Sequence, residues 1–164
     1  MAEANGKKPA YPPVGTMAPN FRAPTSGGKT VKLSDLKGQV VVLYFYPKDN
    51  TSGCTKEACG FRDAWAQFRK AGIEVLGVSP DSVKSHDNFA GKFNLPFTLV
   101  ADEDKSICQA YGVWQEKSMY GRKYFGVART TFVIDKTGKI AHIFEKVKTT
   151  GHEQEVLDWI QANL

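Results

Sequence analysis

Residues 40–59 read Val-Val-Val-Leu-Tyr-Phe-Tyr-Pro-Lys-Asp-Asn-Thr-Ser-Gly-Cys-Thr-Lys-Glu-Ala-Cys. The run over 40–46 is apolar and aromatic throughout, too short for a buried helix, and β-branched at its start, so it predicts a central strand. Pro47 ends that strand. Beyond it, apolar side chains recur at intervals of three and four from Ala58 to Phe68, which is one stripe of an amphipathic helix.

Two cysteines, Cys54 and Cys59, lie where this strand turns into the helix. Unpaired backbone N–H groups and the helix dipole favour an anion at the first turn. We therefore expect Cys54 to tend toward the thiolate, which is the nucleophilic form of cysteine. On a regular helix, Cα atoms five positions apart are separated by about 8.6 Å, whereas a disulfide needs less than roughly 7 Å. The two cysteines can therefore join only if the start of the helix unwinds.

The rest of the chain alternates between extended and helical segments, then ends in a hairpin and a helix. Beyond the strand at 40–46, the pattern predicts extended segments at 21–24, 30–33, 73–78, 97–100, 130–134 and 139–144. It predicts helices at 54–70, from 79–82 to 93, at 105–111 and at 152–164. This order indicates an α/β protein with a central mixed β-sheet flanked by helices. Residues 1–13 are expected to form a flexible N-terminal tail, and residues 14–164 a single domain.

Composition excludes several classes of protein. The net charge of +5 is spread over the 164 residues without a dense basic run, so a solvated basic surface is favoured over a nucleic-acid partner. No segment reaches the ~18 apolar residues of a membrane span, and the N-terminus lacks the apolar core of a secretory signal. Three cysteines are too few for a secreted disulfide scaffold. We expect a cytoplasmic protein without a membrane partner.

The motif Pro47-x-x-x-Thr51-x-x-Cys54 resembles the active-site signature of the peroxiredoxins. With Cys59 and the residues at 60–63, it is similar to the bacterioferritin comigratory protein branch, also called peroxiredoxin Q. The resemblance extends from about residue 14 to 164. It includes the segments 75–79, 102–104, 111–114, 116–118 and 129–135.

This resemblance implies a thioredoxin-like fold and a thiol-dependent peroxidase. Cys54 is then the peroxidatic cysteine and Cys59 the resolving cysteine, while Thr51, Pro47 and Arg129 complete the peroxide pocket. The implied substrates are hydrogen peroxide and organic hydroperoxides. The implied cycle passes through a Cys54 sulfenic acid and an intramolecular Cys54–Cys59 disulfide, which thioredoxin or a similar dithiol reduces. Neither a cofactor nor a metal is implied, and a monomer is expected.

Three side chains near this motif have readings that the sequence leaves open. Family members commonly carry proline after the motif threonine, and Ser52 in that place predicts a more mobile loop. Cys108 is expected in the core, with an alternative resolving thiol as the minority interpretation. Glu57 either favours the helix N-terminus or orients Arg129.

Two other functions were weighed against the peroxidase. A zinc site usually takes four ligands at short paired spacings, but Cys54 and Cys59 have no second pair. His86, His142 and His152 are scattered and are expected at the surface or at helix ends. A redox-sensing module, in which the disulfide alters a binding surface, is the remaining alternative to an enzyme.

Overall fold

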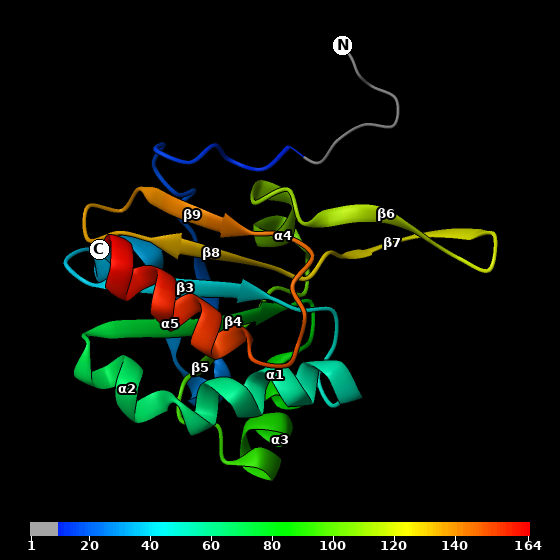
Figure 1. The fold of residues 1–164 in the computed structure, drawn as a ribbon. Coiled ribbons are helices and arrows are strands. Elements are labelled where there is room, and N and C mark those ends of the chain that lie inside the picture. The colour runs from blue at the N-terminus through cyan, green and yellow to red at the C-terminus, as the bar shows by residue number, and fades with distance from the viewer. Residues whose placement is uncertain (1–9) are drawn as a thin grey trace.

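A five-stranded sheet forms the centre of the protein in the computed structural model, which describes residues 10–164 (Figure 1). The strands follow the order β5-β4-β3-β8-β9 and span Thr98–Ala101, Ile73–Ser79, Val40–Phe45, Thr130–Ile134 and Ile140–Phe144. The β3–β4 and β4–β5 pairs are parallel, whereas β8 runs antiparallel to both β3 and β9. The predicted mixed sheet is confirmed, and the bounds of each of its strands differ from the prediction by one residue or less.

Both faces of the sheet are covered. Every residue of β3 is buried, and its side chains alternate between two cores because successive residues of a strand point to opposite faces. Val42 and Tyr44 belong to one core, and Val41 and Leu43 to the other. The first core is covered by α1 (Ser52–Asp63), α2 (Trp65–Lys70), α3 (Val83–Phe93) and α5 (His152–Asn163). The second is covered by α4 (Ser106–Ala110) and the N-terminal part of the chain.

The predicted helix at 54–70 is two helices. The first begins at Ser52, two residues earlier than expected, and Ala64 separates α1 from α2 with non-helical backbone angles of φ −95° and ψ 5°. Phe61 and Phe68, on either side of the bend, are both buried in the same core. The apolar periodicity therefore continues across the bend, which is why the sequence did not reveal it.

The prediction of a flexible tail over residues 1–13 needs correction at Tyr11. Its ring packs edge-on against Phe132, with 6.1 Å between ring centroids, and its hydroxyl accepts a hydrogen bond of 3.1 Å from Gln115 Nε2. Tyr11 is therefore attached to the domain through both its ring and its hydroxyl. Residues 1–9 lie outside the described part of the chain, and the prediction stays untested for them.

Two small two-stranded sheets flank the central one. β1 (Arg22–Pro24) and β2 (Thr30–Lys32) match the extended segments predicted there, and they pair antiparallel. β6 (Trp114–Met119) and β7 (Arg122–Val127) form a hairpin that was not predicted, and Figure 1 shows it projecting from the body of the molecule. Most of the β7 side chains are exposed, so this strand lacks the apolar alternation that marks a half-buried strand.

None of the helices within residues 10–164 has both the length and the apolar character needed to cross a membrane.

Candidate active site

The candidate site forms where β3 ends and β8 begins. Phe45 and Thr130, at these two positions, are paired in the antiparallel β3–β8 ladder. The chain leaves β3 toward α1, and Arg129 lies directly before β8. The antiparallel pairing therefore brings Arg129 to the same edge of the sheet as Cys54.

Cys54 lies in the first turn of α1 and is 2% exposed. Arg129 Nη2 donates a hydrogen bond of 3.2 Å to its Sγ atom. The guanidinium also packs against Gly53, where a Cβ atom would lie 3.4 Å from the same Nη2 atom. Cys54 thus combines a position at a helix N-terminus with a direct contact to a guanidinium.

The second nitrogen of the same guanidinium binds Glu57. Arg129 Nη1 donates to Glu57 Oε1 at 2.6 Å, and the Glu57 side chain is fully buried. Burial raises the pKa of Glu57 from 4.5 to about 7, although the positive charge of Arg129 opposes that shift. Its other oxygen, Oε2, has no hydrogen-bond partner among the described residues. Of the two readings left open for Glu57, the structure therefore supports the one in which it orients Arg129.

Thr51 and Pro47 bound the turn that precedes α1. Thr51 is exposed and occupies the N-cap position, but its hydroxyl does not cap the helix. The hydroxyl instead donates to the carbonyl of Lys48 at 3.0 Å. Its lone pairs are left free to accept a hydrogen bond from a bound molecule. Pro47 follows the β3 strand and is half-buried.

Cys59 lies in the same uninterrupted helix as Cys54 and is half-buried, and neither thiol is in a disulfide. In a continuous helix their Cα atoms are about 8.6 Å apart, beyond the range for a disulfide.

Cys108 is completely buried in the core opposite to that of Cys54. Burial, assisted by the nearby Asp102, raises the pKa of its thiol. A buried thiol with a raised pKa is unreactive, so this environment favours the core interpretation.

A hollow lies beside Arg129. It is lined by residues of the N-terminal segment, of β6, of the segment before β8 and of the segment after β9: Tyr11, Gln115, Lys117, Ala128, Arg129, Glu145 and Lys146. Burial lowers the pKa of Lys117, and the positive charge of nearby Arg129 lowers it further. The unpredicted β6–β7 hairpin thus supplies a second cation near Cys54.

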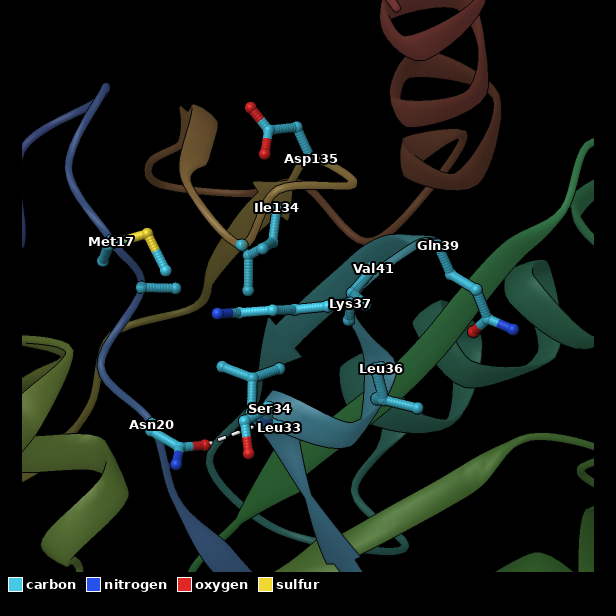
Figure 2. A pocket seen from close by; sticks show the side chains of 12 residues that line it. Met17, Asn20, Leu33, Ser34, Leu36, Lys37, Gln39, Val41, Ile134 and Asp135 are labelled. Atoms are coloured by element: carbon cyan, nitrogen blue, oxygen red, sulfur yellow. Dashed lines mark hydrogen bonds between the residues drawn. The ribbon is translucent and has the colours of Figure 1, made fainter.

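A different hollow lies at the opposite end of the sheet (Figure 2). It includes Val41 and Ile134, which pair at the far end of the β3–β8 ladder from Thr130. Asn20 Oδ1 accepts from the Ser34 backbone N–H there, at 2.9 Å. Figure 2 shows the Lys37 side chain extending across this hollow. None of the predicted site residues lines it.

Sequence analysis missed a buried polar cluster next to the turn before α1. Asp49, Asp81 and His86 bring ligand-type atoms within 4.8 Å of one another. His86 lies near the start of α3, one of the two places expected for it, but its side chain is completely buried. No spacing signal marks this cluster, since its members come from three separate segments.

Comparison with known proteins gives a consistent match. Residues 14–143 match the model of the AhpC/TSA family. The chain is 56% identical over 144 residues to a protein from Coxiella burnetii named putative peroxiredoxin bcp, which covers 88% of this chain and 95% of that protein.

Solved structures agree with this match. A mutant of PrxQ from Xylella fastidiosa superposes with a TM-score of 0.89 at 41% identity, covering 93% of this chain and 98% of that one. A structure from work on the alkyl peroxide reduction activity of Xanthomonas campestris bacterioferritin comigratory protein has a TM-score of 0.83 at 43% identity, covering 87% and 90%.

Proposed function

The chain belongs to the AhpC/TSA family and is a peroxiredoxin similar to the Bcp and PrxQ proteins, and from this premise we propose how its residues reduce a peroxide. Peroxiredoxins are peroxidases that use thiols. We propose that Cys54 is the peroxidatic cysteine, that Cys59 resolves it, and that Thr51, Pro47 and Arg129 form the peroxide pocket. The observation that carries the proposal is the contact of 3.2 Å between Arg129 Nη2 and Cys54 Sγ in the first turn of α1.

In the first step the Cys54 thiolate attacks one oxygen of the hydroperoxide. A bond forms between sulfur and that oxygen, the O–O bond breaks, and the departing oxygen takes a proton to leave as water or an alcohol. Arg129 stabilises the negative charge that moves from sulfur to the departing oxygen. Thr51, whose own proton is directed to Lys48, can accept the hydrogen bond of the peroxide O–H. Cys54 is left as a sulfenic acid.

In the second step Cys59 attacks the sulfenic sulfur, and water leaves as the disulfide forms. The continuous α1 helix keeps the two cysteines too far apart for this bond, so its first turns must unwind. A dithiol reductant then restores both thiols by exchange.

The preferred reductant is proposed to be thioredoxin or a similar dithiol, in the cytoplasm, where thiols are kept reduced. Because both cysteines belong to one chain, a monomer suffices for the cycle. The similar Xanthomonas protein has an alkyl peroxide reduction activity. This supports organic hydroperoxides as substrates of the present protein alongside hydrogen peroxide.

Mass spectrometry after one equivalent of peroxide tests the assignment. We expect a single bond between Cys54 and Cys59, with Cys108 still carrying a free thiol. Cys59→Ser should consume one peroxide per chain and then stop, whereas Cys54→Ser should consume none. Undiminished turnover of Cys59→Ser with thioredoxin, or a bond that involves Cys108, would contradict the proposal.

A redox-sensing module is the competing function. Turnover with excess thioredoxin separates the two, because an enzyme cycles through many peroxides whereas a sensor stays oxidised. The buried, cation-bound position of Cys54 favours the enzyme.

A further inference from the structure

The turn at residues 47–51, which leads into α1, is held by buried polar side chains to which the proposed chemistry gives no role. Asp49 is 5% exposed, and its carboxylate accepts three hydrogen bonds. The donors are the Tyr46 hydroxyl at 2.6 Å, the Ser85 hydroxyl at 2.8 Å and His86 Nδ1 at 2.7 Å. Asp49 therefore ties the turn both to the end of the β3 strand and to α3.

His86 completes this attachment from the other side. Its Nε2 atom lies 2.9 Å from the carbonyl oxygen of Val100 at β5. A carbonyl oxygen can only accept, so Nε2 carries a proton. Its Nδ1 atom lies 2.7 Å from the Asp49 carboxyl group, so both ring nitrogens have buried partners. Removing either side chain would leave a buried polar atom of the other without its partner.

Asp81 fixes the backbone of the same turn. Its Oδ2 atom accepts from the Asp49 N–H at 2.8 Å and from the Ser79 hydroxyl at 2.6 Å. The Asp49 N–H belongs to the same planar peptide as the Lys48 carbonyl, and in a trans peptide the two point in opposite directions. That carbonyl holds the Thr51 hydroxyl at 3.0 Å. One rigid peptide therefore connects Asp81 on one side to Thr51 on the other.

The orientation of this peptide decides what Thr51 can do. While the Lys48 carbonyl accepts its proton, the Thr51 hydroxyl offers only lone pairs, which suits the O–H of a hydroperoxide. If the peptide rotated, the hydroxyl would be free to donate instead. We propose that Asp81 and the Asp49–His86 pair are positioning residues for peroxide reduction that act on Thr51 through the Lys48–Asp49 peptide. This inference rests on the function proposed above for Thr51 and Cys54.

The same cluster is less suited to a metal ion. The carboxylate oxygens that would ligate a cation already accept the Asp49 N–H, two hydroxyls and the imidazole proton. A cation would displace these donors, and the Asp49 N–H would lose its acceptor in a part-buried place.

Two neutral variants of Asp81 test the inference, each in a Cys59→Ser background so that one thiol reacts. Asp81→Asn keeps an oxygen that can accept from the Asp49 N–H, whereas Asp81→Ala removes it, and both lose the same charge. We expect Asp81→Ala to lower the second-order rate constant of Cys54 with hydrogen peroxide about tenfold, and Asp81→Asn to stay within about threefold of the parent. Alkylation of Cys54 by iodoacetamide needs a thiolate but no Thr51 acceptor, so it should change by less than about twofold in both.

A double-mutant cycle shows whether Asp81 acts through Thr51. In a Thr51→Val background the hydroxyl is absent, and Asp81→Ala should then produce no further loss of rate. Ser79→Ala, which releases the Asp81 carboxylate without removing it, gives a smaller loss and replaces Asp81→Ala if that variant unfolds.

Equal losses in Asp81→Ala and Asp81→Asn, additive losses with Thr51→Val, or a parallel fall in alkylation would each overturn the inference. These outcomes are separate from failure of the proposed function. If the parent protein forms no sulfenic acid at Cys54 at all, the proposed function itself fails.

Discussion

Arg129 is the residue that joins the parts of the site, because its two terminal nitrogens bind different partners. Nη2 reaches Cys54 Sγ at 3.2 Å, and Nη1 reaches Glu57 Oε1 at 2.6 Å. The planar fork of a guanidinium can hold both, whereas an ammonium group is a single point charge on a flexible stem. Glu57 fixes one arm of the fork, and so fixes where the other arm meets the sulfur.

Replacing Arg129 by lysine should therefore impair the peroxide step despite conserving the charge. We expect the second-order rate constant of Arg129→Lys with hydrogen peroxide to fall about 100-fold, the lower end of the loss on removing one well-placed donor at a reacting group. Stopped-flow measurement of Cys54 oxidation checks this. Arg122→Lys, at an exposed position of the β7 strand, is the matched control and should react like the parent. A loss below threefold in Arg129→Lys would show that charge alone suffices.

At this scale the sequence predicted the residues with chemical signatures and missed those that support them. Cys54, Thr51 and Pro47 belong to one motif, and Arg129 was implied by the family resemblance; the pairing of β3 with β8 brings it near them. Asp81 and His86 carry no such signal. Their contacts with Asp49 span 32 and 37 residues of sequence, and depend on how α3 packs against the sheet.

At the scale of elements, the proposed cycle requires two different conformations of the start of α1. It is wound where Cys54 contacts Arg129, and in the proposed cycle it unwinds so that Cys59 can reach the oxidised sulfur. Ser52 is the first residue of this helix, and Thr51 before it has extended backbone angles of φ −84° and ψ 156°. Proline is favoured at the first helical position, and an extended residue before it is the conformation that proline requires. The backbone at this point is thus already compatible with a proline.

Ser52→Pro should therefore stabilise the wound form and slow disulfide formation. We expect the free energy of unfolding to rise by about 0.5–1 kcal/mol, through a less flexible unfolded chain. If unwinding precedes the bond, the rate of Cys54–Cys59 joining should fall by up to about fivefold, with the peroxide step unchanged. Urea unfolding and stopped-flow fluorescence measure the two quantities. Ser52→Ala, which lacks the restricted ring, is the control; a faster joining rate in Ser52→Pro would contradict this account.

The hairpin of β6 and β7 was beyond the reach of sequence patterns for a physical reason. Its turn residues Tyr120 and Gly121 both have positive φ angles, 54° and 78°, which suit a tight two-residue connection. Only the glycine hints at that conformation in the sequence. Because the hairpin projects into solvent, most of its side chains are exposed or half-buried, and its sequence lacks the apolar alternation of a half-buried strand. The strands of the central sheet, buried on both faces, had the opposite character and were predicted well.

At the scale of the whole molecule, the N-terminal part of the chain is bonded to the central sheet through its backbone. Residues 15–18 form backbone hydrogen bonds with the β8–β9 hairpin, from Gly15 and Ala18 to Ile140 and Gly138. The chain at Ala10, just before this segment, passes close to Gly112. A Cβ atom at position 112 would lie 2.6 Å from the Ala10 carbonyl oxygen, so the glycine permits this approach. The segment therefore stabilises the sheet on the side away from α1.

Tyr11→Ala should lower stability without altering the chemistry. The ring packs on Phe132 and is half-buried, so we expect a loss of about 2 kcal/mol, below the usual cost of truncating a fully buried aromatic residue. Tyr11→Phe keeps the ring and loses only the hydrogen bond from Gln115, and should lose about 1 kcal/mol. Thermal unfolding measures both. Equal melting temperatures for Tyr11→Ala and the parent would mean that this contact adds nothing.

The pH dependence of global stability depends on Glu57. Burial raises its pKa in the folded protein from 4.5 to about 7. Between these values the folded state keeps a proton that the unfolded state has lost, so stability must fall as pH rises through that window. The full shift corresponds to about 3 kcal/mol. Below pH 4.5 both states hold the proton, and this contribution no longer changes.

Glu57→Gln should remove that fall, because an amide of the same shape does not titrate. Burial lowers the pKa of His142 and of His152, which makes stability rise with pH in part of the same range. Both histidines are present in parent and variant, so the difference between their two pH curves isolates Glu57. Urea unfolding at intervals from pH 4.5 to 7.5 gives the curves, with the exposed Glu103→Gln as control. Parallel curves for Glu57→Gln and the parent would mean that the buried carboxyl is ionised throughout, held so by Arg129 alone.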